Sequence, residues 1–485
     1  MPGSGNGKKH KGYVHLISLG CDKNLADSEK VLAMMLEAGY RYTDDPYRAD
    51  IIVVNTCCFI KDAKEESVET LIQVTDLKRE KEGQLPVIIV MGCMSERYRE
   101  EIQETLPEID IVMGANSWQD IIEVSDAYFR KRSEAGDNSV LHMQSFRDIS
   151  ENVFLEKPVK DRFITAGGHY AYLKIAEGCG KHCTYCIIPS LKGSYRSVPM
   201  EDLTAEAEGL AAQGVRELIL IAQETTLYGV DLYGRKCLPE LLERLNAIDG
   251  IRWIRIMYCY PEEITDELTE AIRSLPKVCH YLDIPIQHAS DHILRRMARR
   301  TTQQEIRERL GYLRKRIPDI VIRTTLISGF PGETDRDHKI LTEFVREMEF
   351  DRLGDFEYSR EEGTKAAQFS HQISSKTKAI RRGEIMEIQQ GIAARKALSR
   401  IGQVYEVMIE GRLTEDAPSE GDMFPFGNSF PEGNVYVGRT YMDAPDIDGF
   451  IYVRTGQKRY MTGDMMRVLV TGAHGYDLLG EPADV

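Results

Sequence analysis

The segment Ile175-Ala-Glu-Gly-Cys179-Gly-Lys-His-Cys183-Thr-Tyr-Cys186 places three cysteines in the spacing CxxxCxxC, directly after a predicted strand. Three thiolates this close together can bind three irons of an iron–sulfur cluster and leave the fourth iron without a protein ligand. An open iron can bind a substrate, whereas a fully ligated cluster only passes electrons. A zinc site with His182 as the fourth ligand is the alternative, but structural zinc sites usually pair CxxC units or combine CxxC with HxxxH. The spacing therefore favours a substrate-binding iron–sulfur cluster.

The composition indicates a protein of a reducing compartment, which we expect to be the cytoplasm, with a basic protein partner. The 485 residues are enough for several domains. We find no run of about 18 apolar residues and no apolar segment in the polar start, so neither a transmembrane helix nor a secretory signal is expected. Ten cysteines without such a signal favour metal binding over disulfides. The net charge of −15 argues against general affinity for DNA or RNA and suits a basic protein.

Residues 12–131 alternate apolar runs with helical patterns, which predicts an open α/β domain. The apolar runs are continuous, as in parallel sheets that are covered on both faces. The predicted strands are Tyr13–Leu19, Ile51–Thr56, Val87–Met91 and Ile109–Met113. A polar linker is expected over residues 132–164.

Three cysteines follow three of these strands. Cys21 comes after the first strand, Cys57 ends the second and Cys93 follows the third. Strand carboxyl ends lie along one edge of an open parallel sheet, and ligands bind there. One such cysteine alone is readily explained as a small buried apolar residue. Three at the same structural position favour a metal site.

Residues 165–401 contain a second βα series, which predicts a partial (β/α)6 barrel with its active face at the strand carboxyl ends. The predicted strands are His169–Ala176, Val215–Ala222, Ile251–Tyr258, His280–Ile286, Asp319–Ile327 and Arg352–Tyr358. The chain is thus an α/β multidomain protein, and the cysteine loop follows the first barrel strand.

Residues 402–473 change to short β-prone runs, which predict a small barrel of oligonucleotide-binding type. A tail is expected over residues 474–485. From Arg400 onward there are about 7 Lys and Arg against about 14 Asp and Glu, a composition poorly suited to RNA binding. The predicted strands are Val404–Glu410, Met423–Phe426, Asn434–Tyr441, Gly449–Val453 and Met466–Thr471.

The cysteine motifs together resemble the radical S-adenosylmethionine (SAM) methylthiotransferases over residues of about 12–472. The shared features are GCxxN around Cys21, NTC at Cys57, GC at Cys93, CxxxCxxC and a terminal β domain similar to the TRAM domain, which docks the substrate. The resemblance implies two 4Fe–4S clusters, one on Cys21, Cys57 and Cys93 and a SAM-cleaving one on the CxxxCxxC loop. Cys58 follows Cys57 directly, and the NTC register favours Cys57 as the ligand.

The family has two branches, which modify an adenosine of tRNA or an aspartate of small-subunit ribosomal protein twelve. The segments 438–449 and 475–478 look like the ribosomal-protein branch. The acidic terminal domain agrees, because ribosomal proteins are basic. We expect a basic partner to dock at Asp443, Asp446 and Asp448, although aspartates also build turns.

The resemblance implies that a 5′-deoxyadenosyl radical takes hydrogen from the aspartate β-carbon and that the second cluster delivers the methylthio group. No catalytic side chain is predicted, because acids and bases cannot activate this C–H bond. The resemblance also implies an electron donor such as flavodoxin or ferredoxin. We expect no membrane partner and no DNA partner. The alternatives are a tRNA methylthiotransferase and a non-enzymatic iron–sulfur RNA-binding protein.

Candidate SAM contacts lie at the strand ends that face the barrel mouth. Arg323 is a candidate for pairing with the SAM carboxylate, with a structural ion pair as its alternative. His288 is interpreted as a hydrogen-bonded barrel residue, and the basic run Arg295–Arg300 as a solvated helix face. The predicted SAM-binding residues are Tyr185, Gln223, Glu224, Gln287, Ser290, Arg323 and Gly329.

Overall fold

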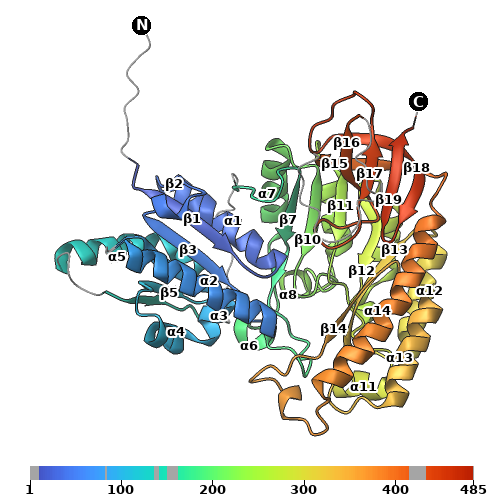
Figure 1. Ribbon diagram of the computed structural model, residues 1–485, viewed down its shortest axis with the longest axis horizontal. Helices are drawn as coiled ribbons and strands as arrows, with labels where there is room; N and C mark the ends of the chain where they lie inside the picture. Colours follow the sequence, from blue (N-terminus) through green and yellow to red (C-terminus); the bar gives the residue numbers. More distant parts are fainter. Residues whose placement is uncertain (1–9, 82–84, 136–140, 150–161, 414–432, 484–485) are drawn as a thin grey trace. The chain divides into compact units, whose positions relative to one another are not determined.

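The computed structural model describes residues 10–81, 85–135, 141–149, 162–413 and 433–483 (Figure 1). The chain forms two compact units. The first comprises residues up to Thr165 together with 177–181 and 186–209, and the second comprises 166–176, 182–185 and 210–485. Among the described helices, none combines the length and the apolar character needed to span a bilayer.

The first unit is built on a six-stranded sheet in which every neighbouring pair is parallel. This arrangement confirms the predicted open α/β fold. The strand order is β2-β1-β3-β4-β5-β6, with β1 at Tyr13–Ser18, β2 at Arg41–Tyr42, β3 at Ile51–Thr56, β4 at Val87–Gly92, β5 at Ile111–Met113 and β6 at Met143–Ser145.

Helices cover both faces of this sheet. Ile51 and Val53 of β3 join one apolar cluster, while Ile52 and Val54 join the other, because successive strand residues point to opposite faces. The helices are α1 (Asp22–Glu37) and α5 (Ile121–Ala135) on one face, and α2 (Lys61–Glu80), α3 (Cys93–Arg97), α4 (Arg99–Thr105) and α6 (Ile188–Lys192) on the other. The short turns η1 (Pro46–Arg48) and η2 (Trp118–Asp120) complete the unit.

Two short edge strands were not predicted. β6 lies inside the expected linker yet pairs with β5, with Ile111 opposite Met143. β2 is only two residues long and pairs with β1. Strands this short carry no alternation that a sequence pattern can reveal.

The second unit contains a six-stranded parallel sheet whose strand order follows the chain, which confirms the predicted partial barrel. The order is β14-β13-β12-β11-β10-β7, with β7 at Tyr170–Lys174, β10 at Glu217–Ile221, β11 at Trp253–Ile256, β12 at Val278–Asp283, β13 at Val321–Ser328 and β14 at Arg352–Glu357. The short strands β8 (Ala176–Glu177) and β9 (Arg196–Ser197) form a separate pair.

Helices connect these strands, and each begins after a strand carboxyl end as the βα pattern requires. They are α7 (Met200–Ala212), α8 (Val230–Tyr233), α9 (Leu238–Asn246), α10 (Asp266–Ser274), α11 (Asp291–Arg296), α12 (Gln303–Arg316), α13 (Asp335–Met348) and α14 (Ser375–Leu398), with turns η3 (Pro261–Glu263) and η4 (Ala366–Gln368).

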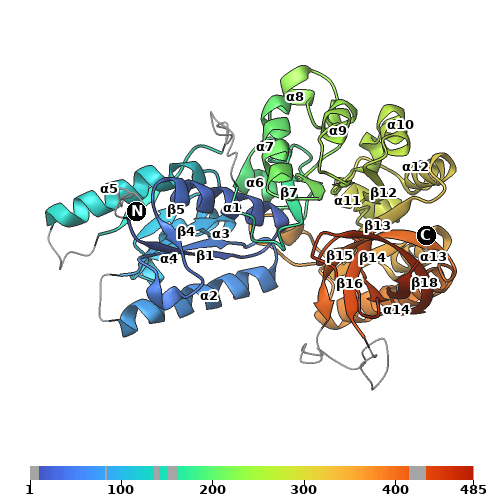
Figure 2. The same cartoon turned by 90° about the horizontal axis from the view of Figure 1, so that it is seen from above.

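The chain continues into a closed five-stranded barrel, drawn in red in Figure 2. The order is β15-β16-β17-β19-β18, with β15 at Val404–Leu413, β16 at Val435–Thr440, β17 at Ile451–Arg454, β18 at Met465–His474 and β19 at Asp477–Pro482. β19 lies in the expected tail, where Asp, Gly and Pro masked its strand character. The predicted strand Met423–Phe426 lies outside the described residues.

Candidate functional site

Cys21 and Cys57 lie in the loops that follow the adjacent strands β1 and β3, and Cys93 begins α3 directly after β4. Cys21 precedes α1 and is exposed, whereas Cys57 and Cys93 are buried. Burial raises the pKa of the Cys57 thiol to about 11, and the nearby thiols of Cys21 and Cys58 contribute. Burial also raises the pKa of Cys93 well above its usual range, with contributions from Cys57 and Cys21. The thiols of the three loops therefore act on one another electrostatically.

Glycines before two of these cysteines allow the loops to approach. Gly20 has φ +84°, and a Cβ there would lie 2.4 Å from the Cβ of Cys57. Gly92 has φ +102°, and its Cβ would lie 2.4 Å from Oδ1 of Asn55. Any side chain at either position would force neighbouring loops apart. These clashes explain why glycine precedes Cys21 and Cys93 in the sequence.

A buried amide network fixes the same loops. The Asn24 side chain donates to the carbonyl oxygens of Leu19 at 3.0 Å and Thr56 at 3.1 Å, which ties the first loop to the second. Asn55 donates to the carbonyl oxygen of Asn24 at 3.0 Å. Buried hydrogen-bonded amides resist displacement, since a lost partner leaves an unsatisfied polar group. The sequence analysis missed both asparagines as determinants of the site, although each stands in a quoted motif.

Cys57 and Cys58 occupy different environments. Cys58 is fully buried and packs in the apolar cluster beneath α2 and α3. Cys57 faces the Gly20 loop, and Ser67 holds its backbone by accepting from its N–H at 3.0 Å and donating to its carbonyl at 2.8 Å. In the described part of the chain, no three Cys, His, Asp or Glu side chains already stand at metal-binding distances. The three thiols fit an iron–sulfur cluster by donor type and by their shared edge.

The CxxxCxxC loop begins with a close backbone contact. Gly178 has φ +80°, and a Cβ there would lie 2.1 Å from the carbonyl oxygen of Ser194. The N–H of Cys179 donates to the carbonyl of Gly193 at 3.1 Å. Within the second unit, Sγ of Cys183 lies 3.8 Å from Oη of Tyr260. Cys179 and Cys183 are buried, and Cys186 is partly exposed.

Arg299 is a buried cation beside Cys183. Its guanidinium lies 4.1 Å from the centroid of the Tyr260 ring and donates to the carbonyl of Pro285 at 3.0 Å. Burial opposes its charge, but Tyr185, Tyr260 and Cys183 nearby raise the pKa of Arg299 above its usual range. The prediction that Arg295–Arg300 is a solvated helix face is therefore wrong for Arg299, because burial depends on neighbours that the local pattern does not show.

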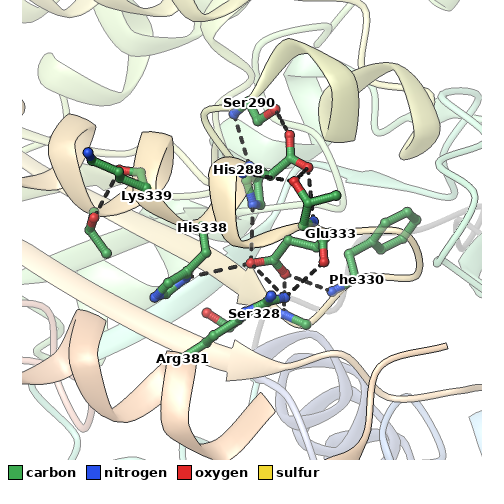
Figure 3. Close-up of polar contacts among 12 residues, drawn as sticks. His288, Ser290, Ser328, Phe330, Glu333, His338, Lys339 and Arg381 are labelled. Carbon is green, nitrogen blue, oxygen red and sulfur yellow. Dashed lines mark hydrogen bonds and ion pairs between the residues drawn. The ribbon is translucent and has the colours of Figure 1, made fainter. Parts of the chain in front are cut away.

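Glu333 organises the turn after β13, as Figure 3 shows. Its carboxylate accepts from the backbone N–H groups of Gly329 and Phe330. Nη1 of Arg381 lies 3.4 Å from Oε1, and Nε2 of His288 lies 3.9 Å from it. Burial opposes ionisation, yet the nearby His288 and His338 rings and the charge of Arg381 hold the pKa of Glu333 at about 2. The Gly-Phe-Pro-Gly turn is thus fixed by an ionised carboxylate that the sequence analysis had not singled out.

Three models of protein families match the chain. They are the uncharacterized protein family UPF0004 over residues 13–114, the radical SAM superfamily over 173–345 and the TRAM domain over 426–482. The ribosomal protein uS12 methylthiotransferase RimO of Lachnoclostridium phytofermentans is 53% identical over 96% of this chain and 99% of that protein. Its counterpart in Acetivibrio thermocellus is 45% identical over 97% of this chain and 98% of that protein.

The chain belongs to the ribosomal protein uS12 methylthiotransferase family. It is therefore a transferase, and the predicted family and branch are confirmed. The radical SAM methyltransferase TsrM of Kitasatospora setae shares the fold, with a TM-score of 0.51, 14% identity, and coverage of 71% of this chain and 72% of that one.

In this member of the family, the remaining predicted SAM-binding residues lie after strand ends. The ring of Tyr185 meets Phe330 edge to face at 6.5 Å. Glu224 is buried after β10 and accepts from the N–H of Thr226 at 3.0 Å, and Gln223 precedes it. The N–H of Gln287 donates to the carbonyl of Thr325 at 2.9 Å.

Ser290 and Gly329 make contacts within the protein at the same end of the sheet. Oγ of Ser290 donates to Asp337 at 2.5 Å at the start of α13. Gly329 has φ +76°, and a Cβ there would lie 2.3 Å from Cγ of Lys378. Their SAM contacts stay predictions.

Arg323 lies near the beginning of β13, away from its carboxyl end. Its guanidinium donates to Asp283 at 2.8 Å and lies 3.6 Å from Asp448. Burial works against the charge, but these carboxylates raise the pKa of Arg323 above its usual range. These contacts are those of its alternative, the structural ion pair, and the pairing of Arg323 with SAM stays a prediction.

The acidic segment 438–449 does not form the exposed docking surface that was expected. Asp443 is buried and ion-paired with Arg352, and Asp448 accepts from Tyr281 at 2.7 Å. Asp446 is exposed but accepts from Tyr170 at 2.8 Å. These aspartates dock the closed barrel against β7, β12 and β14 of the second unit. The sequence shows a run of acidic residues, which suggests surface charge. It does not show the arginine and tyrosine side chains that bind these residues in the fold.

Proposed function

We propose that this protein transfers a methylthio group to the β-carbon of an aspartate in ribosomal protein uS12. The proposal rests on the presence of two separate cysteine sets in a chain that is 53% identical, over 96% of its length, to a uS12 methylthiotransferase. The relative is named for a ribosomal protein substrate, and ribosomal proteins are basic as a class. A basic substrate agrees with the net charge of −15 of this chain.

Cys21, Cys57 and Cys93 are the proposed ligands of one 4Fe–4S cluster, and Cys179, Cys183 and Cys186 of the other. Each set leaves one iron without a protein ligand. Bound there, the clusters and SAM supply the radical and sulfur-transfer chemistry that no amino-acid side chain provides. Cys57 rather than Cys58 is the proposed ligand, and its position beside Gly20 supports that choice.

The chain's own residues hold these groups in place. Asn24 and Asn55 keep the first two cysteine loops together, and Gly92 lets the third approach. Glu333 holds the turn after β13, where backbone amides are available to a ligand. Arg299 places a buried positive charge beside Cys183.

Mass spectrometry of a strain that lacks the gene tests the substrate. Peptides of uS12 should lose the methylthio mass, and complementation should restore it, while tRNA nucleosides stay unchanged. Loss of methylthio-adenosine from tRNA with intact uS12 modification would instead support the tRNA branch. The purified enzyme should modify uS12, free or within the ribosome, when SAM and reductant are supplied.

The cellular setting follows from the same chemistry. We propose a cytoplasmic enzyme that receives electrons from a low-potential one-electron donor such as flavodoxin or ferredoxin, and the reducing conditions that iron–sulfur clusters need and the ribosomal substrate support this. An anaerobic assay in which each reduced donor replaces dithionite tests this. Deoxyadenosine formation with either protein supports it, and failure with both refutes that donor class.

A further inference from the structure

Lys192 is a buried cation between the flanks of the two cysteine motifs. It ends α6, six residues after Cys186, and is 3% exposed. Its Nζ donates to the carbonyl of Ala115 at 3.3 Å and lies 3.4 Å from Oε2 of Glu177 and 3.9 Å from Oδ2 of Asp27. All of these residues belong to the first unit.

The neighbours of Lys192 connect both motifs. Glu177 precedes Cys179 by two residues, and Asp27 lies in the helix that starts after Cys21. Leu191, the preceding residue of α6, packs in the same apolar cluster as Cys93, and α6 contacts α3. The ammonium therefore lies beside α1, which follows Cys21, and is paired with Glu177 just before the CxxxCxxC loop, while its own helix packs on the helix that Cys93 begins.

The position of this charge matters because negative groups are concentrated around it. Three thiolates and two buried carboxylates concentrate negative charge in a region of low dielectric constant, where each charge acts strongly. One-electron reduction of a cluster held there adds one more negative charge.

We propose that Lys192 is a positioning residue that stabilises the reduced form of the cluster on Cys21, Cys57 and Cys93. The inference deepens the proposed function and rests on it. The alternative is a purely structural role, in which Lys192 only neutralises the charges of Glu177 and Asp27. That alternative predicts lower stability on substitution but no change in the reduction potential of the cluster.

The test is a redox titration of the full-length chain followed by electron paramagnetic resonance. The titration uses the Cys179→Ala, Cys183→Ala, Cys186→Ala background, in which only the other cluster remains, with dithionite as the electron source. Lys192→Gln should move the midpoint potential to a more negative value, while Lys192→Arg should keep it near that of the parent. Lys30→Gln is the matched control, because Lys30 is ion-paired with Glu206 at 2.8 Å in the same unit.

In the chain with all six cysteines, Lys192→Gln should lower methylthio transfer by about 10- to 100-fold, the usual effect of removing a group that supports metal ligands. SAM cleavage should fall much less. An unchanged midpoint potential in Lys192→Gln would overturn the proposal, as would an equal shift in Lys30→Gln.

A second variant covers the case in which Lys192→Gln does not retain iron. Asp27→Asn keeps the shape of the side chain and removes one carboxylate that shares the ammonium. Its midpoint potential should move to a more positive value, and an unchanged value would refute the proposal. The proposed function and the role of Lys192 can fail separately. If the wild-type chain modifies no uS12, the proposed function fails, but the midpoint potentials of the variants still test the role of Lys192.

Discussion

The two cysteine sets differ in how the chain brings them together. Cys179, Cys183 and Cys186 lie within one loop, so chain connectivity alone keeps them close. Cys21, Cys57 and Cys93 are joined through the register of the first sheet, in which Ser18 pairs with Asn55 and Thr56 with Gly92, and through the amides of Asn24 and Asn55. A loop motif depends on few neighbours, whereas a site at a sheet edge depends on every contact that sets the edge.

The largest effect is expected from the loop motif. Replacing Cys179, Cys183 and Cys186 with Ala should abolish SAM cleavage and leave about half of roughly eight irons per chain. Anaerobic reconstitution, iron analysis and chromatography of 5′-deoxyadenosine measure both quantities. Continued formation of deoxyadenosine would contradict the assignment of this loop.

The set at the sheet edge should give the reverse result. Replacing Cys21, Cys57 and Cys93 with Ala should also remove about half of the iron. SAM cleavage should persist, because the second motif is intact, while methylthio transfer to uS12 is lost. Loss of both reactions in this variant would show that the two sites do not function separately.

A glycine substitution tests the dependence on register. Gly92→Ala adds a Cβ 2.4 Å from Asn55 and 2.5 Å from the Thr56 carbonyl, so the Cys57 and Cys93 loops must separate. We expect loss of iron from the sheet-edge site and a stability cost of about 2–4 kcal/mol, typical of overpacking plus backbone strain.

Gly214→Ala is the control for Gly92→Ala, because Gly214 has the same φ of +102° with nothing within 4 Å. It should cost only about 1 kcal/mol and leave iron unchanged. Thermal unfolding and iron analysis separate the two variants. Similar iron loss in both would mean that strain, rather than the close approach of the loops, is decisive.

The smallest effect is expected at Cys58. Cys58→Ala removes a buried thiol from the apolar cluster and should cost about 1 kcal/mol without loss of iron. Cys57→Ala, its neighbour, should lose the cluster. If Cys58→Ala loses iron instead, the choice of Cys57 as ligand was wrong.

Much of the fold was predictable because its signals are local. Continuous apolar runs identified β1, β3 and β4, and the βα alternation identified the six strands of the partial barrel. The strands β2, β6 and β19 escaped because they are short or rich in turn-forming residues. The cysteines of both sites were predicted from spacing and from strand ends, but which side chains support them was not.

The sequence by itself determined the fold class, the family resemblance and the six candidate ligands, since each depends on spacing or on periodicity along the chain. Tertiary structure alone decided the roles of the charged residues. Arg323 pairs with Asp283 and Asp448, Arg299 lies beside Cys183, and Lys192 lies beside Asp27 and Glu177. The physical reason is that a charge acts through whatever lies within a few ångströms of it in a medium of low dielectric constant, and those neighbours come from distant parts of the chain.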